Sequence, residues 1–513
     1  MSFVSPTMEP WILSYETAAL CCVALFFIYS RKLARFLYFT LKIPGPSLYE
    51  MARIHAKPLL SDDFATYVWK MCEHYNYKPW GMWTCNFNFV VFVSNCETIS
   101  EVFKSKNTTD KPRMFYKPMA RYLGRALFTV NGETYKKQRK RTAVCFRKPV
   151  VESLLSTMNK RMAMLISQLS DKADGQDIDI HALVEDHFWV ATTSSFISIP
   201  VPDHESRLFM EAIRDGMELV QLESVNSLYY WLVHKWRTRR TESNMYEALR
   251  IGKKIVPAEK SLYLGPRDEE ITASAGQALL KEYTKLEERD ADRELFDQAL
   301  TLIAANHETT SFAVNILLLI LALHEDVQQK VYEEIETILG DSERPIETAD
   351  LARMDYTEMV IKETLRLFPP APLMARKVKD DTQIGGVVVP KGSIVVVNAM
   401  AVQRNPENYP DPLRFDPTRF SPEASEGRHP YAFIPFSSGL RNCPGQLQAY
   451  LLIKIFLCYM LRNFKVLRGE NLTSVEDIKT RMCVTLRLCE PLLRLSRRRD
   501  DTTFEKVECV EPA

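Results

Sequence analysis

The chain has 513 residues, of which 46% are hydrophobic and 26% are charged, and its formal net charge is +1. This is the composition of a globular protein with a large core, and the balanced charge gives no reason to expect nucleic acid as a partner. The 11 cysteines follow no regular spacing and form no Cys-x-x-Cys pair. The pattern excludes a disulfide framework and a common zinc site, and it fits a reducing compartment.

The first element along the chain is a mostly apolar stretch, Trp11 to Ser30, followed at once by Arg31, Lys32 and Arg35. About 20 apolar residues are enough to span a bilayer, and positive charge directly after the span keeps that side cytosolic. We therefore predict an N-terminal membrane anchor with a basic flank over residues 1–40. A cleaved signal peptide and a buried core helix are the alternatives.

A stiff hinge follows at Pro44-Gly45-Pro46, because prolines around a glycine cannot continue a helix. Helical patterns then dominate, and one large, mainly α domain with a minor β portion accounts for residues 41–497. Residues 498–513 form a charged tail. Short β-rich pieces are predicted at residues 89–93 and at residues 386–397, where two valine-rich runs around Pro-Lys-Gly indicate a hairpin.

Two stretches in the first half of the chain are rich in positive charge. One is a run of five cations, Lys136, Lys137, Arg139, Lys140 and Arg141, and the other, residues 229–240, mixes aromatic and basic side chains. Most such runs are solvated helix faces. The second run also suits a membrane interface, and aromatic core packing is an equal alternative.

A long apolar helix with polar residues at its centre is predicted over residues 299–323. The centre, residues 305–310, reads Ala-Asn-His-Glu-Thr-Thr. An acid beside an alcohol in an apolar helix is costly unless it is paired or has a function. Glu308 and Thr309 are therefore candidates for proton transfer. The alternative is a threonine bonded to the carbonyl four residues earlier.

Two further helices are predicted over residues 325–339 and 356–368. The second ends at Pro369-Pro370 and carries Glu363 and Arg366 on one face. The same Glu-x-x-Arg spacing occurs twice elsewhere in the chain. The apolar setting and the prolines that follow distinguish this copy.

Cys443 lies in the loop Phe-Ser-Ser-Gly-Leu-Arg-Asn-Cys-Pro-Gly, residues 436–445, which runs into an apolar helical stretch, residues 447–461. Glycines let the backbone turn where a Cβ would clash, and N–H groups at a helix N-terminus stabilise a thiolate. Arg441 could pair with an acidic group on a cofactor. A thiolate held in this way suits iron, whereas a buried structural thiol is the alternative.

These ten residues resemble the haem-ligand loop of the cytochrome P450 superfamily, Phe-x-x-Gly-x-Arg-x-Cys-x-Gly. All five fixed positions are filled, by Phe436, Gly439, Arg441, Cys443 and Gly445. The resemblance extends from the anchor to about residue 495. It implies the cytochrome P450 fold, haem b as the cofactor and Cys443 as the axial iron ligand, since thiolate ligation favours O–O cleavage.

The resemblance also implies cationic or polar partners for the two haem propionates. Arg441 and Arg376 match two of the family's partners by position. Arg139 matches the third, in a Trp-x-x-x-Arg pattern where this chain has Tyr135 instead of tryptophan. A phenol can still donate one hydrogen bond.

A structural triad is implied as well. Glu363 and Arg366 correspond to the family's Glu-x-x-Arg pair. Arg419, in an irregular stretch over residues 404–420, corresponds to the arginine that joins the pair. Such a triad holds the haem-binding core rigid.

Residues 305–310 resemble the family's oxygen-activation motif, Ala-Gly-x-Asp/Glu-Thr-Thr. This likeness implies a catalytic relay of protons from Glu308 and solvent through Thr309. Asn306 stands where glycine is usual and adds bulk and an amide to the catalytic site. The motif looks most like the branch that includes family 4. In many of those proteins a glutamate replaces Ala305 and joins the haem covalently, so Ala305 implies non-covalent haem.

Together these motifs imply a microsomal haem-thiolate monooxygenase, anchored in the endoplasmic reticulum membrane with its catalytic domain on the cytosolic face. It would insert one atom of O2 into a small apolar substrate. Electrons would come from NADPH through NADPH–cytochrome P450 reductase, with cytochrome b5 as an optional second donor, and the basic run would face the donor. A haem-thiolate isomerase or dehydratase without a reductase, and a non-enzymatic haem sensor, are the alternatives.

Overall fold

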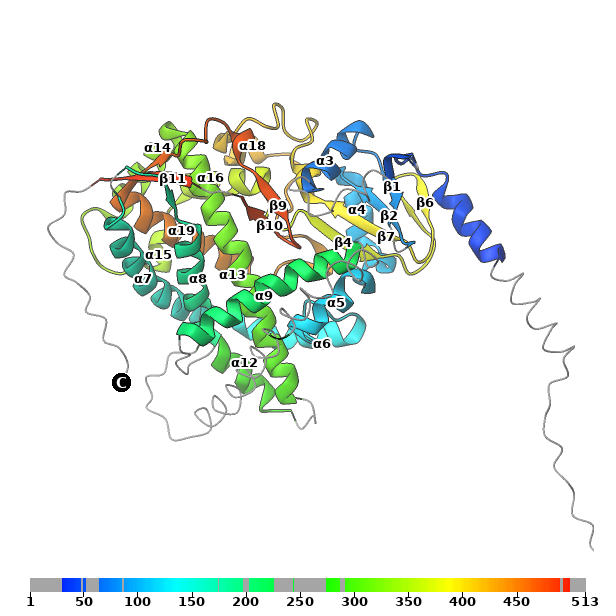
Figure 1. The fold of residues 1–513 in the computed structure, drawn as a ribbon, viewed down its shortest axis with the longest axis horizontal. Coiled ribbons are helices and arrows are strands. Elements are labelled where there is room, and N and C mark those ends of the chain that lie inside the picture. Colours follow the sequence, from blue (N-terminus) through cyan, green and yellow to red (C-terminus); the bar gives the residue numbers. More distant parts are fainter. Residues whose placement is uncertain are drawn as a thin grey trace, which may run out of the picture.

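The computed structural model describes residues 30–498, apart from residues 48, 52–63, 85–86, 174, 197–202, 226–242, 244–273, 287–290 and 490–491. The predicted anchor up to residue 29, the stretch over residues 229–240 and the tail beyond residue 498 lie outside the described residues. The described chain is mainly α with a minor β portion, as predicted, and residues 30–40 form a helix beside the sheet that contains β1 and β2 (Figure 1).

The helices are α3 (Phe64–His74), α4 (Cys96–Lys104), α5 (Arg113–Leu123), α6 (Gly132–Thr142), α7 (Lys148–Ser170), α8 (His181–Phe196), α9 (Asp203–Val225), α12 (Ala275–Tyr283), α13 (Ala291–Leu323), α14 (Glu325–Leu339), α15 (Thr348–Leu351), α16 (Asp355–Leu367), α17 (Ala399–Gln403), α18 (Pro422–Ser425) and α19 (Gln446–Asn463). The strands are β1 (Trp80–Trp83), β2 (Phe89–Val93), β3 (Ile178–Asp179), β4 (Leu373–Lys377), β5 (Thr382–Ile384), β6 (Val387–Val389), β7 (Ile394–Asn398), β8 (Phe464–Arg468), β9 (Thr480–Met482), β10 (Leu486–Leu488) and β11 (Leu492–Arg497).

Helix α13 is the central element of the fold. It packs against α8, α14, α16 and α19, and every residue from Thr310 to Ala322 is buried (Figure 1). Among the described helices it alone is long and apolar enough to span a membrane, but most of its apolar stretch is buried inside the protein. We conclude that α13 is a core helix, and it begins earlier than the predicted residue 299.

The main sheet has the strand order β1-β2-β7-β4, in which β2 and β7 are parallel and the other pairs are antiparallel. The predicted strand over residues 89–93 is confirmed as β2. The predicted hairpin over residues 386–397 is wrong, because β6 pairs with β5 and β7 lies between β2 and β4. The tight turn lies one step earlier, at Gly385 and Gly386, whose φ angles of 56° and 80° favour glycine.

Candidate active site

Cys443 lies between a short 3-10 helix, η4 (Gly439–Arg441), and the start of α19. Its backbone N–H donates to the Phe436 carbonyl at 2.9 Å, which closes the loop. Gly439 has φ of 70°, and a Cβ there would lie 3.2 Å from the carbonyl oxygen of Phe103. A side chain at position 439 would therefore strain the loop that presents the sulfur.

The Cys443 side chain combines two properties that rarely occur together. Of the seven cysteines that the structure describes, Cys443 alone is exposed. Yet burial among surrounding atoms raises the pKa of its thiol, against the lowering by the Gly445 N–H and the Arg139 charge. The sulfur can be both accessible and surrounded by protein atoms if it faces a space inside the fold. The neutral thiol is favoured there until a cation offsets the charge, and a coordinating metal does so.

Three cations gather beside this loop: Lys111, Arg376 of β4 and Arg441. The charges of Arg376 and Arg441 lower the pKa of Lys111, and the charge of Arg376 lowers the pKa of Arg441, in addition to the larger lowering by burial. None of the three forms a salt bridge within the described part of the chain. Asp110, whose charge acts on Arg441, is paired with Lys379 at 3.0 Å. The cluster is therefore an excess of positive charge in which Lys111 and Arg376 are buried and Arg441 is half-buried, and such an excess is costly without an anion.

The hydrogen bonds of these cations go to neutral groups. Lys111 Nζ donates to the Phe128 carbonyl at 2.8 Å and lies 3.7 Å from the centre of that ring. Arg441 donates to the Val130 carbonyl and to Asn131, at 3.0 and 2.8 Å. Arg376 donates to the Ala375 carbonyl at 3.0 Å. These contacts orient the cations without neutralising them.

Tyr135 and Arg139, both on α6, brace the loop from the other side. The Tyr135 hydroxyl donates to the Leu440 carbonyl at 2.6 Å, and its ring lies against the Arg441 guanidinium. Arg139 donates to the carbonyl and the side-chain oxygen of Asn442, at 3.1 and 2.9 Å. The structure thus places Arg139 beside the backbone next to Cys443 and does not bring it into the cation cluster.

The structure brings Glu363, Arg366 and Arg419 together. Arg366 forms two hydrogen bonds with Glu363, at 2.6 and 2.8 Å, and both side chains are fully buried. Arg419 Nε lies 3.6 Å from the same carboxylate without a hydrogen bond. Arg366 also donates to the Gln403 and Pro412 carbonyls. The pair therefore fixes the irregular stretch over residues 404–420 to α16.

The centre of α13 contains a short accessible face. Ala305 is exposed although the helix around it is largely buried. Thr309 lies one turn later, and its hydroxyl donates to the Ala305 carbonyl at 2.8 Å. This is the alternative arrangement that the sequence left open. The hydroxyl must rotate out of this bond before it can donate elsewhere, but its lone pairs remain available as acceptors.

Glu308 is not a free acid. Arg487 of β10 donates to its Oε1 from Nε and Nη2, at 2.9 and 2.7 Å. Both side chains are mostly buried, at 14% and 21% exposure. Arg487 also donates to the Arg214 carbonyl of α9 at 3.2 Å. The sequence indicated the acid but not this partner, which lies far along the chain.

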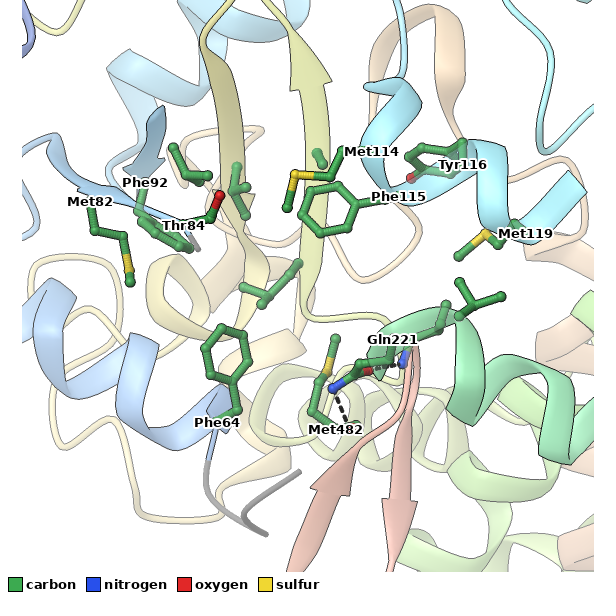
Figure 2. Close-up of a pocket in the computed structure, with 16 residues that line it drawn as sticks. Phe64, Met82, Thr84, Phe92, Met114, Phe115, Tyr116, Met119, Gln221 and Met482 are labelled. Carbon is green, nitrogen blue, oxygen red and sulfur yellow. Dashed lines mark hydrogen bonds between the residues drawn. The ribbon is translucent and has the colours of Figure 1, made fainter. Parts of the chain in front are cut away.

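An apolar cavity of about 140 Å³ lies between α3, the main sheet, α5, α9 and the turn between β9 and β10 (Figure 2). Its wall includes Ala375, the neighbour of Arg376, and is otherwise lined mainly by methionine, phenylalanine and aliphatic side chains. Thr84, Tyr116 and Gln221 bring polar atoms to it. A cavity of this composition suits an apolar ligand.

These features match one protein family: the thiol loop, the cluster of cations, and the helix with an acid beside an alcohol. A comparison with the sequence model of that family decides whether the chain belongs to it. The model described as "Cytochrome P450" matches residues 56–488. This chain belongs to the cytochrome P450 family. Members of the family are haem-thiolate monooxygenases, so this P450 is an oxidoreductase with haem b as its cofactor.

The relatives of this P450 include members of family 4. "Cytochrome P450 4V2" of Pongo abelii is 29% identical over 396 residues, which cover 73% of this chain and 74% of the relative. "Cytochrome P450 4c21" of Blattella germanica is 28% identical over 461 residues, which cover 86% and 90%. The crystal structure of the cytochrome P450DA haem domain has a TM-score of 0.75 at 19% identity, over 89% of this chain and 98% of that domain. This likeness confirms the predicted fold.

The residues of this P450 fit a haem. Haem carries two carboxylates, and the cluster of Lys111, Arg376 and Arg441 has cations that lack an anion. An accessible sulfur, on the loop that also supplies Arg441, provides the thiolate that the family's iron requires. Ala305 offers no carboxylate to a haem methyl, which agrees with non-covalent haem.

Lys111 is the member of this cluster that sequence reasoning missed. It precedes a proline in a polar stretch, Thr-Thr-Asp-Lys-Pro-Arg, where a lysine is expected to be solvated. Its burial depends on contacts with Phe128 and Asn131, which no local pattern reveals. Charge density along the sequence would have pointed to Lys136 and Lys137 instead of Lys111 as partners of a buried anion, but both of these lysines are exposed.

Lys111→Met should have opposite effects on the haem-free and haem-loaded protein. Burial lowers the pKa of Lys111 well below its usual value of 10.5. The folded haem-free chain therefore binds this proton less tightly than the unfolded chain, and it loses stability as the pH falls below 10.5. The variant should be more stable without haem and lose this pH dependence, as urea unfolding between pH 7 and pH 10 would show.

With haem bound, Lys111→Met should speed haem loss by roughly tenfold or more, because the propionates would lose a cationic hydrogen-bond donor. Transfer of haem to a competing haem-binding protein measures this rate. Lys117→Met, an exposed lysine on the same segment, is the matched control and should change neither property. Unchanged haem retention in the Lys111 variant would remove Lys111 from the haem site.

Two polar neighbours of Glu308 point toward α8 in this P450. The Asn306 amide lies 3.5 Å from the Thr192 hydroxyl. His307 is buried edge-on against Trp189, and its Nε2 lies 3.8 Å from Glu185. Burial lowers the pKa of His307 to about 4, so the imidazole is neutral. His307 therefore packs sideways between helices.

Proposed function

We propose that this P450 inserts one oxygen atom of O2 into a small apolar substrate, with electrons supplied from NADPH through NADPH–cytochrome P450 reductase. The observation that carries the proposal is the accessible face of α13, where Ala305 and Thr309 are adjacent to an acid. A haem-thiolate isomerase or dehydratase has no need of an acid and an alcohol in this position.

Four residues would hold the cofactor in this proposal. Cys443 would supply the thiolate to the iron, and Arg376, Arg441 and Lys111 would pair with the propionates. Phe436, Gly439 and Gly445 shape the loop, and Arg139 with Tyr135 braces it from α6. When bound, the thiolate-ligated haem supplies the activation of oxygen.

The distal residues would deliver protons. The Thr309 hydroxyl would rotate away from the Ala305 carbonyl and donate its own proton toward the haem site, and Glu308, which takes a proton from solvent, would return one to the Thr309 oxygen. Asn306 precedes this acid by two residues, and its amide donates to the Thr192 hydroxyl of α8 at 3.5 Å. The apolar cavity would bind the substrate, because its lining is mainly methionine, aromatic and aliphatic side chains.

The electron donor would approach α6. Lys136, Lys137 and Lys140 are exposed there, and Arg139 contacts the residue next to Cys443. A positive surface near the thiolate steers an acidic donor such as the reductase, or cytochrome b5 as a second donor. The apolar stretch before Arg31 would anchor the protein in the endoplasmic reticulum membrane, with the catalytic domain in the cytosol.

Thr309→Ala tests this function. In the full-length protein with reductase, the variant should still consume NADPH. A much larger fraction of the electrons from NADPH should end in hydrogen peroxide instead of in product. General acid–base groups contribute about 10²–10⁴-fold to rates, so loss of coupling by at least tenfold is expected. The peroxide formed per NADPH is the measurement.

Thr310→Ala is the matched control, because Thr310 is the neighbouring threonine of α13 and is buried, whereas Ala305 is exposed. It should leave the peroxide share unchanged. An unaltered share in Thr309→Ala would remove Thr309 from the relay. Catalytic turnover of a substrate without any NADPH consumption would instead favour the isomerase alternative.

A further inference from the structure

The hairpin formed by β9 and β10 makes contacts in two directions. Its register pairs Arg487 directly with Arg481, and like charges in opposite positions of a hairpin repel. Each arginine is offset by a different acid, since Arg481 lies 3.8 Å from Glu218 of α9 and Arg487 binds Glu308 of α13. One strand thus carries the partner of the distal acid.

The turn of the same hairpin is fastened to α9. Gln221 donates to the Met482 carbonyl at 2.7 Å and accepts from the Val484 N–H at 2.6 Å (Figure 2). Val484 has φ of 93°, which is strained for a β-branched residue and persists only where its surroundings impose it. The two bonds from Gln221 are contacts that hold this strained turn in place.

The fastened turn is also part of the cavity wall. Gln221, Met482 and Val484 all line the apolar cavity. Arg487 follows Val484 by three residues, so about 10 Å of strand separates the cavity wall from the arginine that holds Glu308. Helix α9 connects the cavity wall to Arg487 by a second route, because Gln221 of α9 lines the cavity and the Arg214 carbonyl of α9 accepts from Arg487.

We propose that Arg487 is a positioning residue for Glu308, and that the hairpin, latched by Gln221, makes the cavity wall and this acid move as one unit. A substrate that displaces the turn would shift Arg487 and release Glu308 for proton transfer. The inference rests on the proposed function of Glu308 in the relay, and it adds a way in which substrate binding controls that relay.

The first test is amide hydrogen exchange in the full-length, haem-loaded protein, which does not depend on turnover. Arg487→Met and Glu308→Gln should each speed exchange in residues 480–488 by roughly tenfold, and the double variant should add nothing further. Arg481→Met is the matched control on the opposite strand. When it is combined with Glu308→Gln, its effect on exchange should add to that of Glu308→Gln, because Arg481 does not bind Glu308. Unchanged exchange in Arg487→Met, or additive effects in its double variant, would overturn the inference.

The second test is the peroxide share with reductase and NADPH. Arg487→Met and Gln221→Leu should both raise it severalfold, because Glu308 is then neither held in position nor released only when substrate is bound. Arg487→Lys should restore part of the coupling that Arg487→Met loses. If Thr309→Ala raises the peroxide share while Gln221→Leu and Arg487→Met do not, the relay stands and this inference fails. If Thr309→Ala leaves the peroxide share unchanged, but the hydrogen exchange of the single and double variants shows that Arg487 and Glu308 are coupled, the relay fails and the ion pair stands.

Discussion

Replacement of Cys443 by serine should abolish the strongly red-shifted Soret band of the ferrous carbon monoxide complex, together with oxygenase turnover. Thiolate ligation produces both the band and the electron density that favours O–O cleavage. Cys443 is the one exposed cysteine among those that the structure describes, and it lies in the loop that matches the family's haem-ligand motif. The measurement is the difference spectrum of the reduced protein with and without carbon monoxide.

Cys458→Ala is the matched control for this experiment. Cys458 is buried on α19, the helix that begins just after Cys443, and its sulfur lies 3.6 Å from Met354. This variant should lose some stability and keep the red-shifted band. An imidazole-type band in the unaltered protein, or a red-shifted band in Cys443→Ser, would contradict the assignment of Cys443.

Glu363→Ala should produce the largest loss of stability, about 3–5 kcal/mol, because it leaves the buried Arg366 without its counter-charge. The Asp416 N–H also loses its acceptor, the Glu363 Oε1 at 2.9 Å. Glu363→Gln should cost less, because the amide oxygen can still accept a hydrogen bond. Urea unfolding of the haem-loaded protein, followed by circular dichroism, measures the difference.

A surface ion pair provides the comparison. Lys391 and Asp380 lie 2.9 Å apart but are 69% and 65% exposed. Lys391→Ala should therefore change the free energy of unfolding by about 0–1 kcal/mol. An equal effect of the two alanine variants would show that Glu363 does not stabilise the core through its charge.

Much of the fold followed from local patterns. Helix α14 spans the predicted residues 325–339, and the strand at residues 89–93 has its predicted bounds, because a 3.6-residue or all-apolar pattern ends at clear boundaries there. The hairpin over residues 386–397 failed for a different reason. A valine-rich run identifies a strand, but it does not specify which strand will pair with it.

In the candidate site, too, local sequence motifs could be predicted, whereas contacts made by the tertiary fold could not. The thiol loop and the Glu-x-x-Arg pair lie within short segments, so their motifs, their sequence setting and the family resemblance together suggested their roles. Lys111 and Arg487 could not be found in this way, because their partners Phe128 and Glu308 are brought to them only by the tertiary fold. Glu308 itself was predicted, yet its ion pair changes how it can act in proton transfer.

The cations Lys111, Arg376 and Arg441 also affect how long the protein persists in a cell. Before haem arrives, the folded chain contains mutually repelling charges in a poorly solvated place. Binding of a dianion removes that penalty and shifts the equilibrium away from the unfolded chain. Newly made protein should therefore be most open to proteases while haem is scarce, and its steady-state abundance should follow haem supply as well as its rate of synthesis.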